Sequence, residues 1–428
     1  MKYINSKYFL LGLITLLIGF NVSAQSDLSS PYSRFGLGDI NSLTPNPILK
    51  SMGGVSNAMS GNTLLNPTNP ASYASLDSLA FIFDAGFYMK NATFSTRQLS
   101  EKGFNSSFDY ASIGISATKR WKLGLGIMPY STREYNVITE HYDDVLGTHN
   151  IAFQGEGGLN KAFFANGFKI NDDISVGITA SYIFGTLFDN TSVYYPDSTF
   201  FLNGKRSINM RVNDFKFDYG ILYKLPVPDY NITVGLTISQ GAKIASKRDI
   251  FIRNMFKGFE NHTESPIDTL VYVKDENVDI KIPGGFGLGV KIDKGEGWVL
   301  GADFNWSHWK GFTMNGANDS IQNSWNLAVG GSYKPESTSI SKYHKKITYR
   351  AGLHFDQTYY NIYGKSINKF GLTLGAGLPI PRSLSTFNVA LEIGRMGTIK
   401  NNLVKETYFN LSVSMSIFDK WFVKKKYK

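Results

Sequence analysis

The last apolar run of the chain, residues 407–418, is the feature that most constrains its fold. It reads TYFNLSVSMSIF, and its apolar residues alternate with polar ones, which predicts a strand with one apolar and one polar face. Its length suits the roughly 9–11 tilted residues with which a strand crosses a bilayer. Aromatic residues and then lysines follow in residues 418–426, as is typical of a membrane boundary. The run therefore predicts the closing strand of a transmembrane β-barrel, with a strand of a water-soluble sandwich as the alternative.

The N-terminus has the features of a secretory signal peptide. Lys2 and Lys7 precede an apolar run over residues 8–20, and Val22-Ser23-Ala24 supplies small residues for cleavage before Gln25. The apolar run is shorter than the roughly 20 residues that a membrane-spanning helix needs. We therefore predict that residues 1–24 are removed on export.

Composition and residue spacing argue against several classes of function. The chain has no cysteine, which excludes disulfides, thiolate metal sites and a lipid anchor on cysteine. Its net charge of +10 comes without a basic helix or basic-aromatic module, so we predict a solvated basic surface and no nucleic-acid partner. None of the six histidines has paired metal-ligand spacing, and His141 with Asp143 and Asp144 is interpreted as a solvated loop cluster. We expect no enzyme activity, no catalytic residues, no metal and no cofactor.

The region before the repeated strands reads as an ordered, loop-rich segment. Residues 25–78 are rich in proline, asparagine, serine and glycine, with one short helical candidate at residues 48–59. Apolar residues persist throughout the segment. This composition predicts a hatch or plug inside a barrel, or else a small N-terminal arm.

From residue 79 onward the alternating pattern recurs many times. Candidate strands lie near residues 79–90, 107–118, 121–133, 159–170, 174–188, 209–223, 231–241, 279–292, 298–309, 322–333, 347–356, 368–377, 386–395 and 407–418. The connections between them alternate between short and long, as in outer-membrane barrels with short periplasmic turns and long outer loops. Only residues 334–346 are out of step, and two soluble sandwiches would have no reason to keep this rhythm.

The predicted fold is thus all-β, a transmembrane antiparallel β-barrel of about 14 strands with an N-terminal hatch. The predicted order is a signal peptide (1–24), a hatch (25–78), a barrel (79–418) and a basic periplasmic tail (419–428). An even number of strands places both termini on the periplasmic side of the outer membrane.

Two groups of residues are candidates for function. The predicted inward faces carry an ionisable set, which is either a selective or gating network or a structural network that fills the lumen: Asp303, Arg350, His354, Asp356 and Glu392. The second group lies in the third strand, where Pro129 follows Gly124 and Gly126. Because proline cannot donate to a strand ladder, Pro129 indicates either an opening in the wall or fraying into the next loop.

The chain resembles the FadL/TodX family of outer-membrane transporters. The resemblance rests on the signal peptide, the strand number and the passage from the hatch into the first strand, which reads KSMGG at residues 50–54 and then Asn69-Pro70-Ala71. It implies hatch roles for Gly53, Gly54 and the Asn-Pro-Ala motif. It also implies that Gly124 to Tyr130 corresponds to the third strand of the family, which is kinked to open sideways.

The resemblance implies passive transport of hydrophobic compounds, such as long-chain fatty acids, with lateral exit through the barrel wall. Residues 30–36 and 419–422 resemble a Bacteroidetes-type branch that also includes barrel subunits of secretion or assembly complexes. A non-transporting subunit of such a complex is therefore the alternative function. The expected partners are outer-membrane lipid, a hydrophobic small molecule and other outer-membrane proteins. The long 242–278 segment and the basic tail depart from the transporter pattern.

Overall fold

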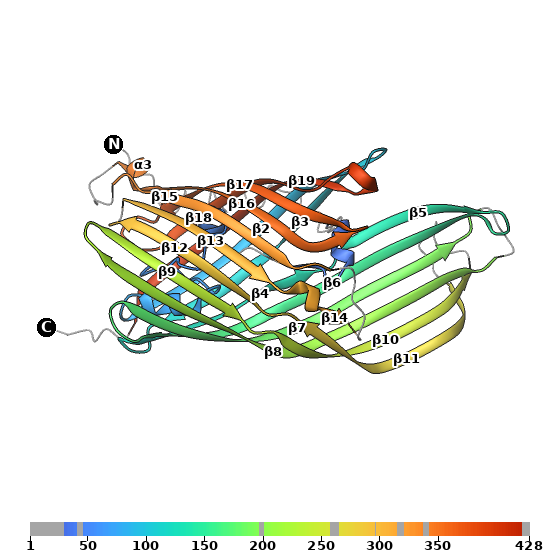
Figure 1. Ribbon diagram of the computed structural model, residues 1–428, viewed down its shortest axis with the longest axis horizontal. Coiled ribbons are helices and arrows are strands. Elements are labelled where there is room, and N and C mark those ends of the chain that lie inside the picture. Colours follow the sequence, from blue (N-terminus) through green and yellow to red (C-terminus); the bar gives the residue numbers. More distant parts are fainter. Residues whose placement is uncertain are drawn as a thin grey trace.

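The computed structural model is an antiparallel β-barrel with a small segment folded inside it (Figure 1). It describes residues 30–40, 46–196, 201–256, 265–295, 297–314, 321–336 and 342–421. The predicted signal peptide and the last seven residues of the predicted tail lie outside these ranges. Within them, fourteen strands form the closed circuit: β2 (Ala80–Ser95), β3 (Ser100–Ile115), β4 (Trp121–Thr132), β6 (Gly147–Lys169), β7 (Ile174–Tyr194), β8 (Asn203–Val227), β9 (Tyr230–Ser239), β12 (Gly285–Lys294), β13 (Trp298–Ser307), β15 (Ser324–Tyr333), β16 (Thr348–Ile362), β17 (Lys365–Pro379), β18 (Thr386–Gly397) and β19 (Lys405–Lys420).

The barrel closes between its first and last strands. The β2–β19 ladder runs from Ala80 opposite Lys420 to Ser95 opposite Lys405, without a register shift. Beyond it, the N–H of Trp421 donates to the carbonyl of Leu79 over 2.9 Å. The barrel therefore begins and ends at the same rim, and β19 extends two residues into the predicted tail.

The wall is apolar outside and polar inside, the reverse of a soluble sandwich. On β19, Ser412, Ser414 and Ser416 are buried, whereas Met415 and Ile417 are 41% and 40% exposed. All three serines lie on the face that was predicted to be polar. This pattern places the apolar face against lipid and confirms the alternation predicted for this strand.

Aromatic pairs mark the two edges of the apolar band. On the ladder between β13 and β15, Trp298 lies opposite Tyr333 near one rim, and Trp306 lies opposite Trp325 near the other. Eight residues separate the two pairs, about 26 Å along a strand at roughly 3.3 Å per residue. With a strand tilt of about 40° this corresponds to a height of roughly 20 Å, close to the apolar band of outer-membrane barrels.

Several segments expected to be loops are strands that continue beyond this band. Most of this additional strand pairing lies in four predicted loops, at residues 91–106, 134–158, 189–208 and 242–278. Two additional strands, β10 (Ala242–Phe256) and β11 (Ser265–Ile282), form a hairpin that covers the last of them and continues to Ile282, inside the candidate strand predicted at 279–292. β5 (Tyr135–Asp143) pairs with β6. In Figure 1 these strands project past the ends of β16 and β17. Sequence alternation weakens there because neither face contacts lipid, so the loop assignment was wrong.

The remaining elements are short and belong mostly to the interior. They are β1 (Asp39–Ile40), β14 (Thr313–Met314), α2 (Pro47–Lys50), α3 (Tyr343–Lys346) and the 3-10 helices η1 (Pro31–Arg34), η2 (Pro70–Ser75), η3 (Trp309–Gly311) and η4 (Lys400–Asn402). The helix expected at residues 48–59 is a single turn, α2. It stops because Gly53 and Gly54 have φ values of +73° and +85°, which end a right-handed helix. No helix of the described chain is both long and apolar enough to cross a membrane.

Candidate functional site

The hatch, residues 30–40 and 46–78 of the described chain, is fixed to the inner wall by buried polar contacts. Asp303 on β13 accepts hydrogen bonds from the backbone N–H groups of Ser56 and Asn57, over 2.6 and 2.8 Å. The Asn57 amide donates to Asn305 over 2.9 Å. Lys50 forms an ion pair with Asp109 at 2.6 Å. Burial makes such contacts costly to lose, because an unpaired charge or N–H would remain in the interior.

The predicted hatch residues shape its turns and caps. The N–H of Gly53 donates to the Thr373 hydroxyl over 2.8 Å, while Gly54 closes the turn after α2. Asn69 caps η2 by accepting the N–H of Ala71 over 3.0 Å, and its amide donates to the carbonyl of Asn57 over 2.6 Å. Pro70 supplies the first residue of η2, where its missing N–H costs nothing.

Glycines of the wall leave room for the hatch backbone. A Cβ on Gly330 or Gly352 would overlap the backbone of Met52, and one on Gly177 would overlap that of Pro70. These three glycines lie on three different strands. The hatch therefore packs directly against the main chain of the wall, with no side chain between them.

Three of the five predicted lumen residues form one network. His354 contacts the carboxylate of Asp356 at 2.6 Å through Nδ1 and that of Glu392 at 3.0 Å through Nε2. Tyr408 donates to Glu392 over 2.8 Å, and Lys369 lies 3.8 Å from the same carboxylate. Each acidic group thus has donors, which is the pattern of a satisfied structural network.

The other two predicted lumen residues lie apart from this network. Asp303 binds the hatch, as described above. Arg350 donates to the Asn388 side chain over 3.3 Å. Among the described residues, no group of three His, Cys, Asp or Glu side chains is arranged to hold a metal ion.

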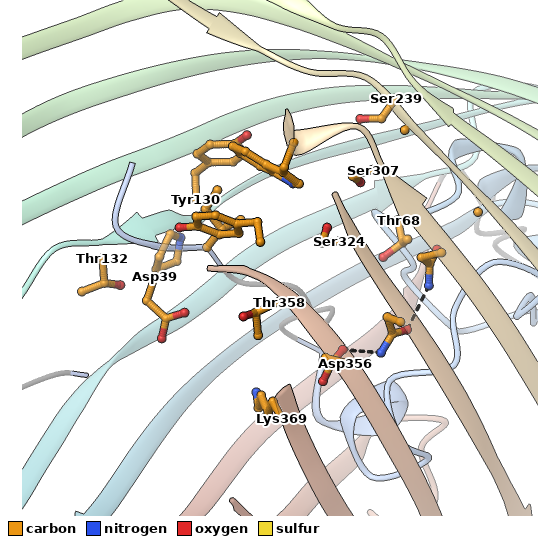
Figure 2. A pocket seen from close by; sticks show the side chains of 18 of the residues that line it. Asp39, Thr68, Tyr130, Thr132, Ser239, Ser307, Ser324, Asp356, Thr358 and Lys369 are labelled. Carbon is orange, nitrogen blue, oxygen red and sulfur yellow. Dashed lines mark hydrogen bonds between the residues drawn. The ribbon is translucent and has the colours of Figure 1, made fainter. Parts of the chain in front are cut away.

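A cavity of about 440 Å³ lies between the hatch and the wall (Figure 2). Its aromatic lining includes Tyr130 and Trp309. Its charged lining consists of five lysines and six carboxylates, namely Lys50, Lys90, Lys161, Lys216, Lys369, Asp39, Asp109, Asp218, Asp356, Glu392 and Glu406. Figure 2 shows Asp39, Asp356 and Lys369 around the same space. Most of these charges are paired within the wall, as in the contacts of Lys90 with Glu406 at 2.6 Å and Lys216 with Asp218 at 2.5 Å.

The predicted opening residues all lie on β4, before and after the point where the β3–β4 ladder ends. Gly124 and Gly126 are within the β3–β4 ladder, opposite Gly114 and Ser112, and the ladder ends where Ile127 faces Ala111. Pro129 lies beyond that end and lines the cavity.

The hatch pairs with the edge of β4 that the break exposes. Ser131 and Thr132 on β4 lie opposite Ile40 and Asp39 of β1. The freed strand edge is therefore partly covered from inside. Gly124 has a second role, since a Cβ there would overlap the ring of Tyr73 from the hatch.

Sequence analysis predicted the cavity carboxylates Asp356 and Glu392 but missed the five lysines and the other four carboxylates. The spacing of Lys216 and Asp218 puts both side chains on one strand face, which is a signal that the sequence offered. The pairs of Lys50 with Asp109 and Lys90 with Glu406 join distant segments. Those pairs depend on the hatch position and the strand register, which the sequence pattern does not specify.

Comparison with solved structures finds barrels of the same fold at low sequence identity. The chain is similar to the CymD monoaromatic hydrocarbon channel, with 13% identity, a TM-score of 0.55 and coverage of 90% of this chain and 98% of that one. It is similar to the Pseudomonas putida toluene transporter TodX, with 14% identity, a TM-score of 0.57 and coverage of 88% and 98%. A Pseudomonas aeruginosa FadL homologue gives 15% identity, a TM-score of 0.52 and coverage of 87% and 98%. These similarities establish a FadL/TodX-type barrel fold.

Sequence comparison supplies the family. No curated protein matches the sequence. The BamG family model matches residues 6–428, which is nearly the whole chain. The protein therefore belongs to the BamG family.

Proposed function

We propose that the protein is a barrel subunit of a larger outer-membrane complex and that its lumen does not conduct hydrophobic compounds. The observation that carries this proposal is the charge-lined cavity behind an anchored hatch. The similarity to hydrocarbon channels, at 13–15% identity, is one of fold. The resemblance to a Bacteroidetes-type branch that includes complex subunits also supports the proposal. We place the short turns and both termini on the periplasmic side.

The charged part of the cavity lining suits ions and water. A hydrocarbon against this part would displace water from ionisable side chains without replacing the lost hydrogen bonds. The lysine–carboxylate pairs also link the wall to itself and to the hatch, as Lys50 does with Asp109. The charges therefore serve to hold a plugged barrel in one shape.

A transporter with lateral exit is the second candidate, and the break at Pro129 favours it. The β3–β4 ladder stops two residues before Pro129, and the cavity reaches this point of the wall. An apolar ligand that left here would enter lipid without crossing the periplasmic rim. The aromatic lining at Tyr130 and Trp309 is the part of the cavity suited to such a ligand.

Native gel electrophoresis of an affinity-tagged chromosomal copy tests the first proposal. After extraction in a mild detergent, we expect the protein to migrate in a complex with stoichiometric partner proteins. Deletion of the gene should reduce the size of that complex and leave the uptake of labelled toluene and oleate unchanged. A monomeric protein whose deletion abolishes uptake would overturn the proposal.

The substitution Pro129→Val separates the two candidates. Valine restores a ladder donor, so a transporter should lose most of its uptake while the barrel still assembles. A complex subunit should keep its partners and show no change in uptake. Pro226→Val is the matched control, because Pro226 also lies within a barrel strand, on β8, but away from the break.

A further inference from the structure

The β5–β6 hairpin brings together two histidines that its turn separates in the sequence. His141 on β5 and His149 on β6 are direct partners in the ladder, so their side chains share one face of the hairpin. Their rings stack with centroids 5.8 Å apart and planes inclined by 23°. Residue spacing alone could not reveal this pair, because it depends on the strand register around the turn.

The histidine pair lies where solvent reaches it. In Figure 1 the hairpin extends past the ends of β16 and β17. His141 is exposed and His149 is half-buried. On the other side of His149, the ring of Tyr195 lies with its centroid 5.9 Å from that of the imidazole. A small cation can therefore reach the two imidazoles from the aqueous side without crossing the barrel wall.

Hydrogen bonds to the two rings determine which nitrogens can bind a metal. Nδ1 of His149 lies 3.3 Å from the carbonyl oxygen of Gly147, which can only accept, so Nδ1 carries the proton and Nε2 keeps its lone pair. The hydroxyl of Thr139 donates to the carbonyl of Ile151 over 3.4 Å, so it accepts from Nε2 of His141, 3.1 Å away. Nδ1 of His141 then keeps its lone pair. A ring N–H held by an oxygen acceptor is the usual support of a metal-binding histidine.

We propose that His141 and His149 form a binding site for a late first-row divalent cation, Cu²⁺ or Zn²⁺. Imidazole nitrogens are preferred ligands of both metals, and Cu²⁺ has the highest affinity of its series for such sites. Metal–nitrogen bonds of about 2.0–2.1 Å hold two ligating nitrogens roughly 3.4 Å apart in a tetrahedral site. Side-chain rotation brings the two stacked rings to this separation, since the ladder already holds their backbones opposite each other.

The site supplies two protein ligands, and water completes the coordination of the metal. Asp143 follows on the same strand face, but its carboxylate closes the turn by accepting the N–H groups of Val145 and Leu146, over 2.8 and 3.0 Å. In the part of the chain that the structure describes, no third His, Cys, Asp or Glu side chain is arranged with the pair to hold a metal ion. The effect of the metal on the protein is therefore to clamp β5 to β6.

Titration with Cu²⁺ tests the proposal on the purified full chain, produced with a tag that contains no histidine. We expect saturable binding at neutral pH, with an electron paramagnetic resonance spectrum that shows two coordinated nitrogens. His141→Ala should weaken the binding at least about tenfold, the lower limit for losing even a supporting partner of a metal ligand, and leave one coordinated nitrogen. His344→Ala removes an exposed histidine in α3 and should change neither the affinity nor the spectrum.

Hydrogen exchange provides a second readout, which depends on the clamp between the two strands. Saturating Zn²⁺ should slow exchange at residues 136–154 of the wild-type protein, whereas Mg²⁺, which prefers oxygen ligands, should not. The double substitution His141→Ala with His149→Ala should abolish the protection by Zn²⁺. Heat-modifiable migration would show that the double variant still folds as a barrel.

Two results would overturn the metal site. One is Cu²⁺ binding that does not saturate or that is unchanged in His141→Ala. The other is protection of the hairpin by Zn²⁺ that persists in the double variant. Neither result depends on whether the protein is a subunit of a complex, so the metal site and the proposed function can fail separately.

Discussion

At the scale of single residues, Asp303 shows how the wall holds the hatch. Its carboxylate receives two backbone N–H groups from adjacent hatch residues, Ser56 and Asn57, in a site that is 3% exposed. Hydrogen bonds to a charged group contribute about 1.5–3 kcal/mol each. We expect Asp303→Ala to destabilise the hatch by about 2–4 kcal/mol and to increase hydrogen exchange at residues 52–59, as measured by mass spectrometry. Asp279→Ala, which removes an exposed ion pair with Lys243, should change exchange in the hatch very little. Equal protection in both variants would show that the other contacts suffice.

At the scale of elements, the period-two pattern allowed the barrel strands to be predicted closely. All fourteen candidate strands overlap strands of the closed circuit, because lipid on one side and polar lumen on the other impose a strict alternation. The β10–β11 hairpin was missed because no lipid contacts it, so its sequence need not alternate strictly between apolar and polar residues. Likewise, the sequence indicated that Asp303, His354 and Glu392 point inward. It contained no signal that His354 would contact Glu392 while Asp303 would bind the hatch. Their partners are set by strand register and by the hatch path.

The facing of β15 permits a sharp test of the membrane position. Val329 is 58% exposed and lies midway between the aromatic residues Trp325 and Tyr333. Val329→Arg should therefore destabilise the barrel by about 2–4 kcal/mol, as expected for arginine at the bilayer midplane. Ser324→Arg on the same strand points toward the cavity and should cost much less. Urea unfolding in lipid vesicles measures both, and similar losses would show that the assigned band is misplaced.

At the scale of the whole molecule, the plugged lumen predicts a barrel that does not conduct. The described hatch lies inside the strands, toward the rim where the barrel begins and ends (Figure 1). In planar bilayers, we expect the full chain to show no steady ion conductance. A variant that lacks residues 46–76 should conduct, because water would then fill the lumen. The two proteins should share heat-modifiable migration and a strand-dominated circular dichroism spectrum, which controls for folding. Steady conductance by the full chain would contradict a sealed lumen.

The wall glycines Gly177, Gly330 and Gly352 couple the evolution of the hatch to that of the barrel. Any mutation that adds a side chain at one of these positions must be accompanied by a retreat of the hatch backbone, so the two parts cannot diverge independently. A hatch borrowed from another barrel would meet glycines in the wrong places and bulky residues where it needs space. Recombination between relatives should therefore preserve the two segments as one inherited unit.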